Sequence, residues 1–244
     1  MVYPVETYPE ATYPEAVYQE KVYGVRAFTP LMLSGLVAWY DASLEVVADG
    51  TALASITDRS GLNNHVLQAT GAKQPVVKNA ILNGKPVYRG DGADDRISAP
   101  FTVGAPWTQF TVFKQRVALP GGSAGVITAA NSDGGHMFYA SAGGAWQLYN
   151  GNNVVIVAID LTMFHTVAVV WNGSNSKYKW DEGAITLCDV GATVNSPSGV
   201  SMFNRTNDTQ PIPADIAEHI VVNRACTDSE VAAVMNYLQT KWGL

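Results

Sequence analysis

Short apolar runs separated by Gly, Asn, Ser and Asp fill the chain from about residue 33 onward. Turn signals such as Asp133–Gly135 and Asn172–Asn175 lie between these runs, a pattern typical of β-strands joined by tight turns. Because strand follows strand without a helical pattern between them, the sequence predicts an all-β fold, an antiparallel β-sandwich or jelly roll. The predicted strands are Leu36–Tyr40, Pro86–Arg89, Thr108–Val117, Gly125–Ala130, His136–Ser141, Trp146–Tyr149, Val154–Ile159, His165–Trp171, Lys177–Trp180 and Ile216–Asn223.

The longest predicted strand, Thr108–Val117, shows how far this alternation extends. Phe110 and Val112 lie on one face, and Lys114 and Arg116 follow on that same face. Successive side chains of a strand point to opposite faces of its sheet. We therefore expect an apolar face that is cleaner in the first half of this strand than in the second.

One segment with helical periodicity stands out at the end of the chain. Thr227 followed by Glu230 is the pattern of a capping box, and Lys241 with Gly243 is typical of a helix end. The sequence therefore predicts a helix over residues 227–242 that packs against an edge of the sandwich. The apolar residues at helical spacing are Val231, Val234, Met235, Leu238 and Trp242.

The first 26 residues follow a five-residue repeat that carries a tyrosine in each unit. Proline removes a backbone donor and favours extended backbone, so we expect residues 1–32 to form an extended or kinked arm. A loose terminal tail remains an alternative. Aromatic residues are rare in disordered segments and common in contact surfaces, which favours an arm that orders on a partner. The expected contact residues are Tyr3, Pro4, Tyr8, Pro9, Tyr13, Pro14, Tyr18 and Tyr23.

Composition and charge limit the classes of partner. Of the 244 residues 47% are hydrophobic, enough for one globular domain with a sizeable core over residues 33–244. Only 15% are charged and the net charge is −6, which argues against a nucleic-acid backbone as partner. We see neither a secretory signal nor an apolar run of membrane length, so we expect synthesis in the cytoplasm and no membrane partner. Cys188 and Cys226 are expected to be buried side chains, and a single bridge between them stays open.

Several stretches, in order, resemble a known fold family. Leu36–Ser43 with Ile56–Asn64, then Gly84–Ile97, then Ile216–Asn223 with the final Lys241–Leu244, are similar to the concanavalin A-like lectin/glucanase jelly roll. The resemblance is to its laminin-G-like form, which is common in bacteriophage virion and bacterial surface proteins. It covers roughly residues 33–244 and implies the fold far more strongly than the function, because this scaffold carries many activities.

The arm and the resemblance together imply a structural role. We expect a phage virion protein of the capsid decoration, cement or head-fibre type, attached through its arm and made in the host cytoplasm. Its partners would be the major capsid protein or other virion proteins, with the chain forming a homo-oligomer on the particle. The alternative is a receptor-binding or glycan-binding adhesin module whose partner is a host-surface glycan.

An enzymatic role is not expected from the distribution of acidic residues and histidines. Hydrolases with the fold that this chain resembles usually carry a Glu-x-Asp-x-(x)-Glu run on one strand, and this run is missing here. The adjacent pairs Asp94–Asp95 and Asp181–Glu182 would diverge on a strand, and fit turn or surface positions better. The histidines show neither metal-ligand nor triad spacing; they are His65, His136, His165 and His219.

Glycan binding would require exposed aromatic rings beside polar loops, often next to a calcium ion. The candidate glycan-binding residues are Trp107, Trp146, Tyr149, Trp180 and Asn150–Asn153, and the candidate calcium ligands are Asp58, Asp91, Asp94 and Asp95. In the alternative interpretation the acids cap turns and these aromatic residues cover sheet surfaces. Trp39, Trp171 and Trp242 are expected in the core, and no other cofactor is expected.

Overall fold

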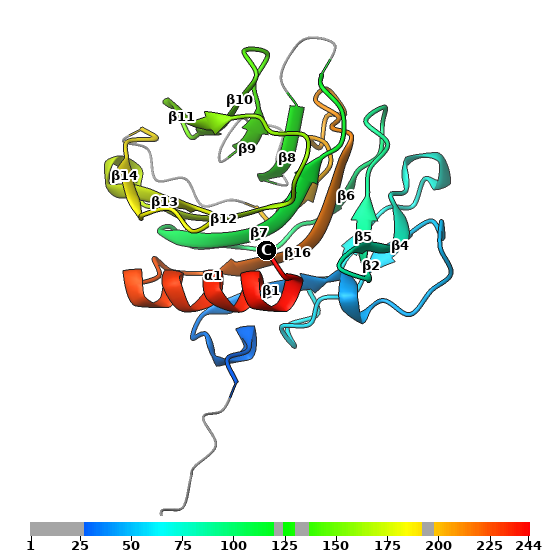
Figure 1. Cartoon of the computed structure of the whole chain (residues 1–244), viewed down its shortest axis with the longest axis horizontal. Coiled ribbons are helices and arrows are strands. Elements are labelled where there is room, and N and C mark those ends of the chain that lie inside the picture. Colours follow the sequence, from blue (N-terminus) through cyan, green and yellow to red (C-terminus); the bar gives the residue numbers. More distant parts are fainter. Residues whose placement is uncertain (1–26, 120–123, 130–136, 192–197) are drawn as a thin grey trace, which may run out of the picture.

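The computed structural model describes residues 27–119, 124–129, 137–191 and 198–244. Within them, two eight-stranded antiparallel sheets lie face to face, and one helix covers the outer face of one sheet (Figure 1). This arrangement confirms the predicted all-β sandwich with a C-terminal helix. The tyrosines and prolines of the predicted arm, at positions 3 to 23, lie outside the described residues, as does His136.

The first sheet carries the helix on its outer face. Its strands are β1 (Leu36–Asp41), β4 (Val76–Leu82), β5 (Lys85–Arg89), β7 (Trp107–Gln115), β12 (His165–Trp171), β13 (Ser176–Trp180), β14 (Thr186–Cys188) and β16 (Ala214–Val222). They are ordered β14-β13-β12-β7-β16-β5-β4, and β1 also pairs with β16. Segments distant in the sequence are therefore neighbours, with β7 between β12 and β16.

The second sheet faces the inner side of the first. Its strands are β2 (Ser55–Ile56), β3 (Val66–Leu67), β6 (Ile97–Ala99), β8 (Ala124–Ala129), β9 (Met137–Ala140), β10 (Ala145–Tyr149), β11 (Asn153–Ala158) and β15 (Val200–Met202). They are ordered β11-β10-β9-β8-β15-β6-β3-β2. A short 3-10 turn at Pro30–Met32 precedes β1, and others at Ala42–Leu44, Gly71–Lys73 and Gly173–Asn175 connect strands.

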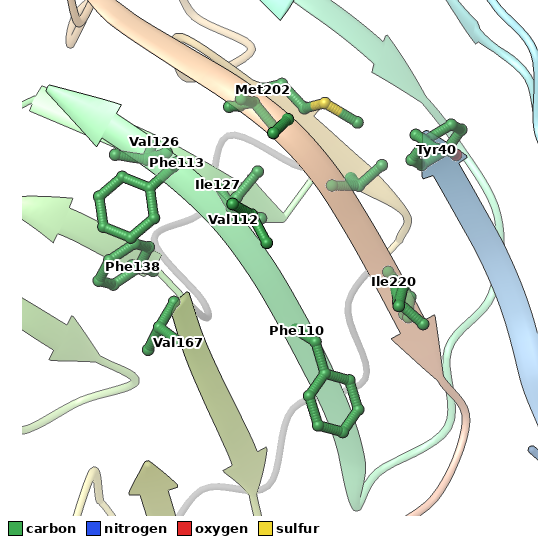
Figure 2. Packing of buried hydrophobic residues seen from close by; sticks show 14 of the residues in the cluster. Tyr40, Phe110, Val112, Phe113, Val126, Ile127, Phe138, Val167, Met202 and Ile220 are labelled. Carbon is green, nitrogen blue, oxygen red and sulfur yellow. The ribbon is translucent and has the colours of Figure 1, made fainter. Parts of the chain in front are cut away.

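The core lies between the sheets (Figure 2), and buried residues of the C-terminal helix extend it beyond the first sheet. Phe113 on β7 packs edge-on against Phe138 on β9 and Trp146 on β10, with ring centroids 4.9 and 4.8 Å apart. Odd-numbered residues of β7 therefore face the second sheet, and even-numbered ones face the helix. Every residue of β7 except Lys114 is buried.

Burial of β7 on both faces goes further than its alternation predicts. Phe110 and Val112 are buried on the helix side, as a clean apolar face requires. The opposite face is buried as well, although it carries Gln109, Thr111 and Gln115. Polar side chains thus lie inside the sandwich, because a second layer covers each side of this strand.

The helix α1 (Asp228–Trp242) forms where the sequence predicts it, but it packs on the outer face of the first sheet, against β7 and β12, and not against an edge. The Thr227 hydroxyl oxygen accepts from Glu230 N at 3.3 Å, and the Glu230 carboxylate accepts from Thr227 N at 2.8 Å. Gly243 ends the helix at φ +69°, a conformation that glycine adopts without strain. All five predicted apolar contacts, at positions 231, 234, 235, 238 and 242, are at most 1% exposed.

A buried carboxylate joins α1 to the first sheet. Glu218 on β16 is fully buried, and its Oε1 accepts from Trp39 Nε1 at 2.7 Å and Tyr237 OH at 3.0 Å. Its Oε2 accepts from Lys241 Nζ and Trp242 Nε1, both at 2.7 Å. Strands β1 and β16 and the last turns of α1 therefore meet at one charged group.

All ten predicted strands are present, with ends that shift by up to two residues. The sequence missed β2, β3, β4, β6, β14 and β15. Most of these are two or three residues long, too short to show alternation. β4 is longer, but Ala80 at φ +55° and a register shift between Lys78 and Leu82 interrupt its pattern. Among the described residues, no helix is long and apolar enough to cross a bilayer.

Candidate functional site

Two of the predicted glycan-binding residues belong to the core. Trp107 is 5% exposed and stacks on Trp171 with ring centroids 5.7 Å apart. Trp146 is fully buried and packs against Phe113 and Phe138. A sugar cannot stack on a ring that other rings already cover. The expectation that these two tryptophans face solvent is therefore wrong.

The other predicted glycan-binding residues are not gathered on one surface. Tyr149 is half-buried at the end of β10, in the second sheet, and the adjoining Asn150 is buried. Trp180 is half-buried on β13, in the first sheet, where its ring lies 4.7 Å from that of His165. Together with the two buried tryptophans, these positions therefore do not build a sugar-stacking platform.

A different hollow, of about 200 Å³, opens where the chain crosses between the two sheets. One wall is the end of β7 with the residues that follow it. The others are the turn between β9 and β10 and the loop from β11 to β12. We call this hollow the crossover pocket; it is lined by Gln115, Ala118, Leu119, Ser141, Ala142, Gly144, Ile159 and Leu161.

Gln115 brings a buried hydrogen-bond acceptor to the crossover pocket. Its side chain is 1% exposed, and Nε2 donates to Val117 O at 2.8 Å. Oε1 has no hydrogen-bond partner. A buried amide oxygen without a partner costs about 1–3 kcal/mol. Gln115 lines the pocket, so a water molecule or a ligand donor that reaches this oxygen would satisfy it.

The rest of the pocket is firmly built and mostly apolar. Gly144 at φ +76° closes the β9–β10 turn, with its N–H donating to Ser141 O at 3.0 Å. Its carbonyl accepts from Ile159 N at 2.9 Å, which fixes the neighbouring loop. Ser141 Oγ accepts from Ala145 N at 3.3 Å, so its hydroxyl hydrogen can still donate. The pocket therefore combines an aliphatic wall with one acceptor and one hydroxyl.

Sequence reasoning missed Gln115 and Ser141 as site residues. The available signal was a glutamine on the same strand face as Phe113, a polar residue in a position that should be core. Recognising it requires knowing that a second sheet covers that face. No local pattern supplies this information.

Asp58, a predicted calcium ligand, stabilises a turn. Its Oδ1 accepts from Trp39 N and Ser60 N, both at 2.9 Å. Its Oδ2 accepts from Ser60 Oγ at 2.7 Å and Asn64 N at 2.9 Å. The carboxylate is thus occupied by the loop that it holds, and lies apart from the other candidate acids.

The remaining candidate calcium ligands come together in the loop between β5 and β6. Asp94 and Asp95 lie in a loop, as expected, and one carboxylate oxygen from each of them and from Asp91 lies within 4.8 Å of the others. Asp91 Oδ1 accepts from Ala93 N at 2.8 Å, and Asp95 Oδ2 accepts from Asp91 N at 2.8 Å. Burial, followed by the charges of Asp91 and Asp94, raises the pKa of Asp95 to about 6. These three residues could hold a hard cation such as Ca²⁺, and this role stays a prediction.

Asp181 and Glu182 border a separate hollow of about 380 Å³ near the end of α1. Asp181 Oδ2 lies 2.8 Å from His165 Nδ1, and its Oδ1 accepts from Thr166 N at 2.7 Å. The carboxylate therefore ties the β13 turn to β12. Glu182 is exposed beside it.

Two histidines and the two cysteines lie in surroundings that fit a structural role. His219 is fully buried, with Nδ1 2.9 Å from Thr111 Oγ1, and burial lowers its pKa to about 3. His65 Nδ1 accepts from Asp58 N at 3.0 Å. Both cysteines are free thiols, which excludes the bridge left open by the sequence; Cys226 is buried and Cys188 half-buried.

Solved structures share this fold. A Trypanosoma rangeli sialidase in complex with sialic acid matches with a TM-score of 0.59 at 14% identity, over 84% of this chain and 33% of that one. The binding domain of Paraclostridial Mosquitocidal Protein 1 matches with a TM-score of 0.58 at 13% identity, over 84% of this chain and 52% of that one. At such identities the likeness shows the β-sandwich fold alone.

The chain spans a third of the length of the sialidase and about half of the Paraclostridial Mosquitocidal Protein 1 chain. A scan against protein-family models finds no match, and a search of the curated proteins finds none either. Function must therefore be argued from the site itself.

Proposed function

We propose that this chain is a glycan-binding module and that the crossover pocket holds one sugar unit of its ligand. The observation that carries the proposal is Gln115 Oε1, a buried acceptor without a partner in the lining of a pocket. A sugar hydroxyl is a donor that would satisfy this oxygen.

The chemistry of the pocket supports a sugar over other small ligands. Sugar recognition needs a few fixed polar groups beside an apolar wall that covers the C–H face of the ring. Leu119, Ile159 and Leu161 provide that wall, and Gln115 and Ser141 provide the polar groups. The volume of about 200 Å³ is below the roughly 300–1,000 Å³ of pockets for drug-sized ligands, which fits a single sugar unit.

The fold is compatible with this function. The same sandwich occurs in a sialidase solved with sialic acid and in the binding domain of a mosquitocidal toxin. These matches support a module for recognition at a surface, and they name sialic acid as one glycan to include in the test.

A glycan array followed by variants of two matched glutamines tests the proposal. Gln115 and Gln109 are both buried on the inner face of β7 with an unpartnered amide atom, but only Gln115 lines the pocket. We expect Gln115→Leu to weaken binding to the strongest array ligand about threefold to tenfold, the effect of one hydrogen bond. Gln109→Leu should leave binding unchanged, and thermal unfolding verifies that both variants fold. Equal effects of the two variants, or an array without any bound glycan, would contradict the proposal.

We further propose binding without hydrolysis. Asp91, Asp95 and Asp181 accept hydrogen bonds from backbone amides of the turns or strands that they hold. Such carboxylates are poorly placed to act as a general acid and base across one bond. The expected result is that the protein releases neither reducing sugar nor sialic acid from glycans that it binds. Release that is lost in Asp181→Asn or Asp95→Asn would overturn this part of the proposal.

A second candidate function is display on a virion, as a capsid decoration, cement or head-fibre protein attached through residues 1–26. The strict register of tyrosines supports it, since several modest contacts on one tether raise avidity. Deleting residues 1–26 should leave a folded domain that no longer joins particles lacking the native copy. Undiminished occupancy of the truncated protein would contradict attachment through the arm.

A further inference from the structure

The aromatic register of the N-terminal repeat continues into the described part of the chain. Tyr18 and Tyr23 are five residues apart, and the next position in the register is Phe28. The Phe28 ring lies 5.6 Å from the ring of Tyr237 on α1, tilted by 60°, and packs against the core. An aromatic ring at this position of the repeat therefore docks on helix α1.

A groove of about 310 Å³ lies beside this contact, on the outward side of α1. Ala27 and Phe28 form one wall, and helix residues spaced by three and four form the other. We call it the α1 groove; its helical lining is Ala233, Asn236, Tyr237, Thr240 and Lys241.

The α1 groove has the chemistry that a tyrosine side chain requires. A phenol ring needs an apolar surface for its faces and a polar partner for its hydroxyl. Ala233 and the rings of Phe28 and Tyr237 offer the apolar surface. Asn236 and Thr240 are exposed and can bond the hydroxyl.

The last repeat lacks the proline that follows the tyrosine in the first three. The first three repeats carry Pro4, Pro9 and Pro14 after their tyrosines, whereas the fifth carries Gly24 after Tyr23. Proline favours extended backbone, and glycine accepts the positive φ that a chain reversal uses. A glycine at this position therefore permits a chain reversal between Tyr23 and Ala27.

We propose that Tyr23 of the same chain occupies the α1 groove, next to Phe28. Only three residues separate Tyr23 from Ala27, which itself lines the groove. So short a tether gives a millimolar effective concentration, which favours this occupant over the arm of another copy. The proline-bearing repeats then remain for contacts with other molecules.

Limited trypsin digestion of the full chain tests the contact, because Lys21 and Arg26 flank Tyr23. Seating Tyr23 protects the bond after Arg26. We expect Tyr23→Ala to speed cleavage there roughly tenfold, as loss of one buried aromatic contact predicts. Tyr8→Ala, at the matching position of a proline-bearing repeat, should not change the rate. An unchanged rate in Tyr23→Ala would overturn the proposal.

Two alanines of α1 provide a matched pair on the other side of the contact. Both are exposed, but only Ala233 lines the groove, whereas Ala232 does not. Ala233→Lys should speed cleavage after Arg26 as much as Tyr23→Ala does. Combining the two substitutions in one chain should not increase the cleavage rate further. Ala232→Lys should match the wild type, and equal effects of the two lysines would contradict the groove. Light scattering shows whether the protein forms a dimer. If it does, and if the protection of the bond after Arg26 disappears when the dimer is diluted, the groove holds the arm of a second copy. That result would overturn docking within one chain.

Discussion

Replacing Glu218 by glutamine should destabilise the fold severely, although the two side chains have almost the same shape. Glu218 is fully buried and accepts hydrogen bonds from two indoles, one phenol and one ammonium group. A glutamine keeps one acceptor oxygen and places an amide donor at the other position. Two of the four hydrogen-bond donors then face the new amide group, which is itself a donor. Lys241 retains only Asp41 as its acidic partner.

The magnitude follows from these contacts. A hydrogen bond to a charged group contributes about 1.5–3 kcal/mol, and removing one partner of a buried ion pair costs about 3–5 kcal/mol. Both energies describe the same contacts of Glu218, so their sum would count these contacts twice. We expect Glu218→Gln to lower the free energy of unfolding by about 3–5 kcal/mol.

Urea unfolding followed by tryptophan fluorescence measures this loss, because Trp39 and Trp242 donate to Glu218 itself. Glu182→Gln is the control, since Glu182 is exposed and should change stability by less than about 0.5 kcal/mol. A loss below about 1 kcal/mol in Glu218→Gln would refute the reasoning, because it would mean that solvent reaches these donors.

Three further predictions concern stability. Leu238→Ala should lower the free energy of unfolding by about 2–5 kcal/mol in urea, since Leu238 is fully buried; a change near zero would place the helix face elsewhere. His219 has its pKa lowered from 6.5 to about 3 by burial, so below about pH 6.5 the unfolded chain binds a proton that the folded one excludes. Stability should fall with acidification by up to about 1.4 kcal/mol per pH unit in that window, and His219→Gln should flatten this dependence. Millimolar Ca²⁺ should raise the thermal midpoint of the wild type but not of Asp95→Asn in calorimetry; an equal shift in both would place the ion elsewhere.

The sequence predicted the fold wherever a local residue pattern indicated a strand or a helix. Except for β4, whose pattern is interrupted at Ala80, strands of five residues or more showed alternation or an apolar run, and the caps and apolar spacing of α1 located the helix. Strands such as β6 and β15 have three residues each, too few for a period. They are strands because they pair with each other, and β15 also with β8, which is information from distant parts of the chain.

The candidate site could not be predicted from local residue patterns in the same way. Residue type suggested Trp107 and Trp146 as sugar-stacking rings, but the second sheet and neighbouring rings bury them. The same layer turns Gln115 from a residue on an open face into a buried acceptor. Glu218 finds donors 179 positions earlier and 24 positions later in the chain. Such sites depend on which face of a strand is covered by another layer of the fold. The sequence of the strand itself does not indicate this.

The most direct measurement for the central claim is a ¹H–¹⁵N NMR titration that follows the side-chain amides of two glutamines. Gln115 Oε1 should accept a hydroxyl of the strongest array ligand, so the Gln115 amide resonances should shift on binding. The Gln109 amide, on the same buried strand face but outside the pocket, should stay in place. A glycan that binds while the Gln115 resonances remain unchanged, with shifts instead around Asp91 and Asp95, would contradict the proposed site.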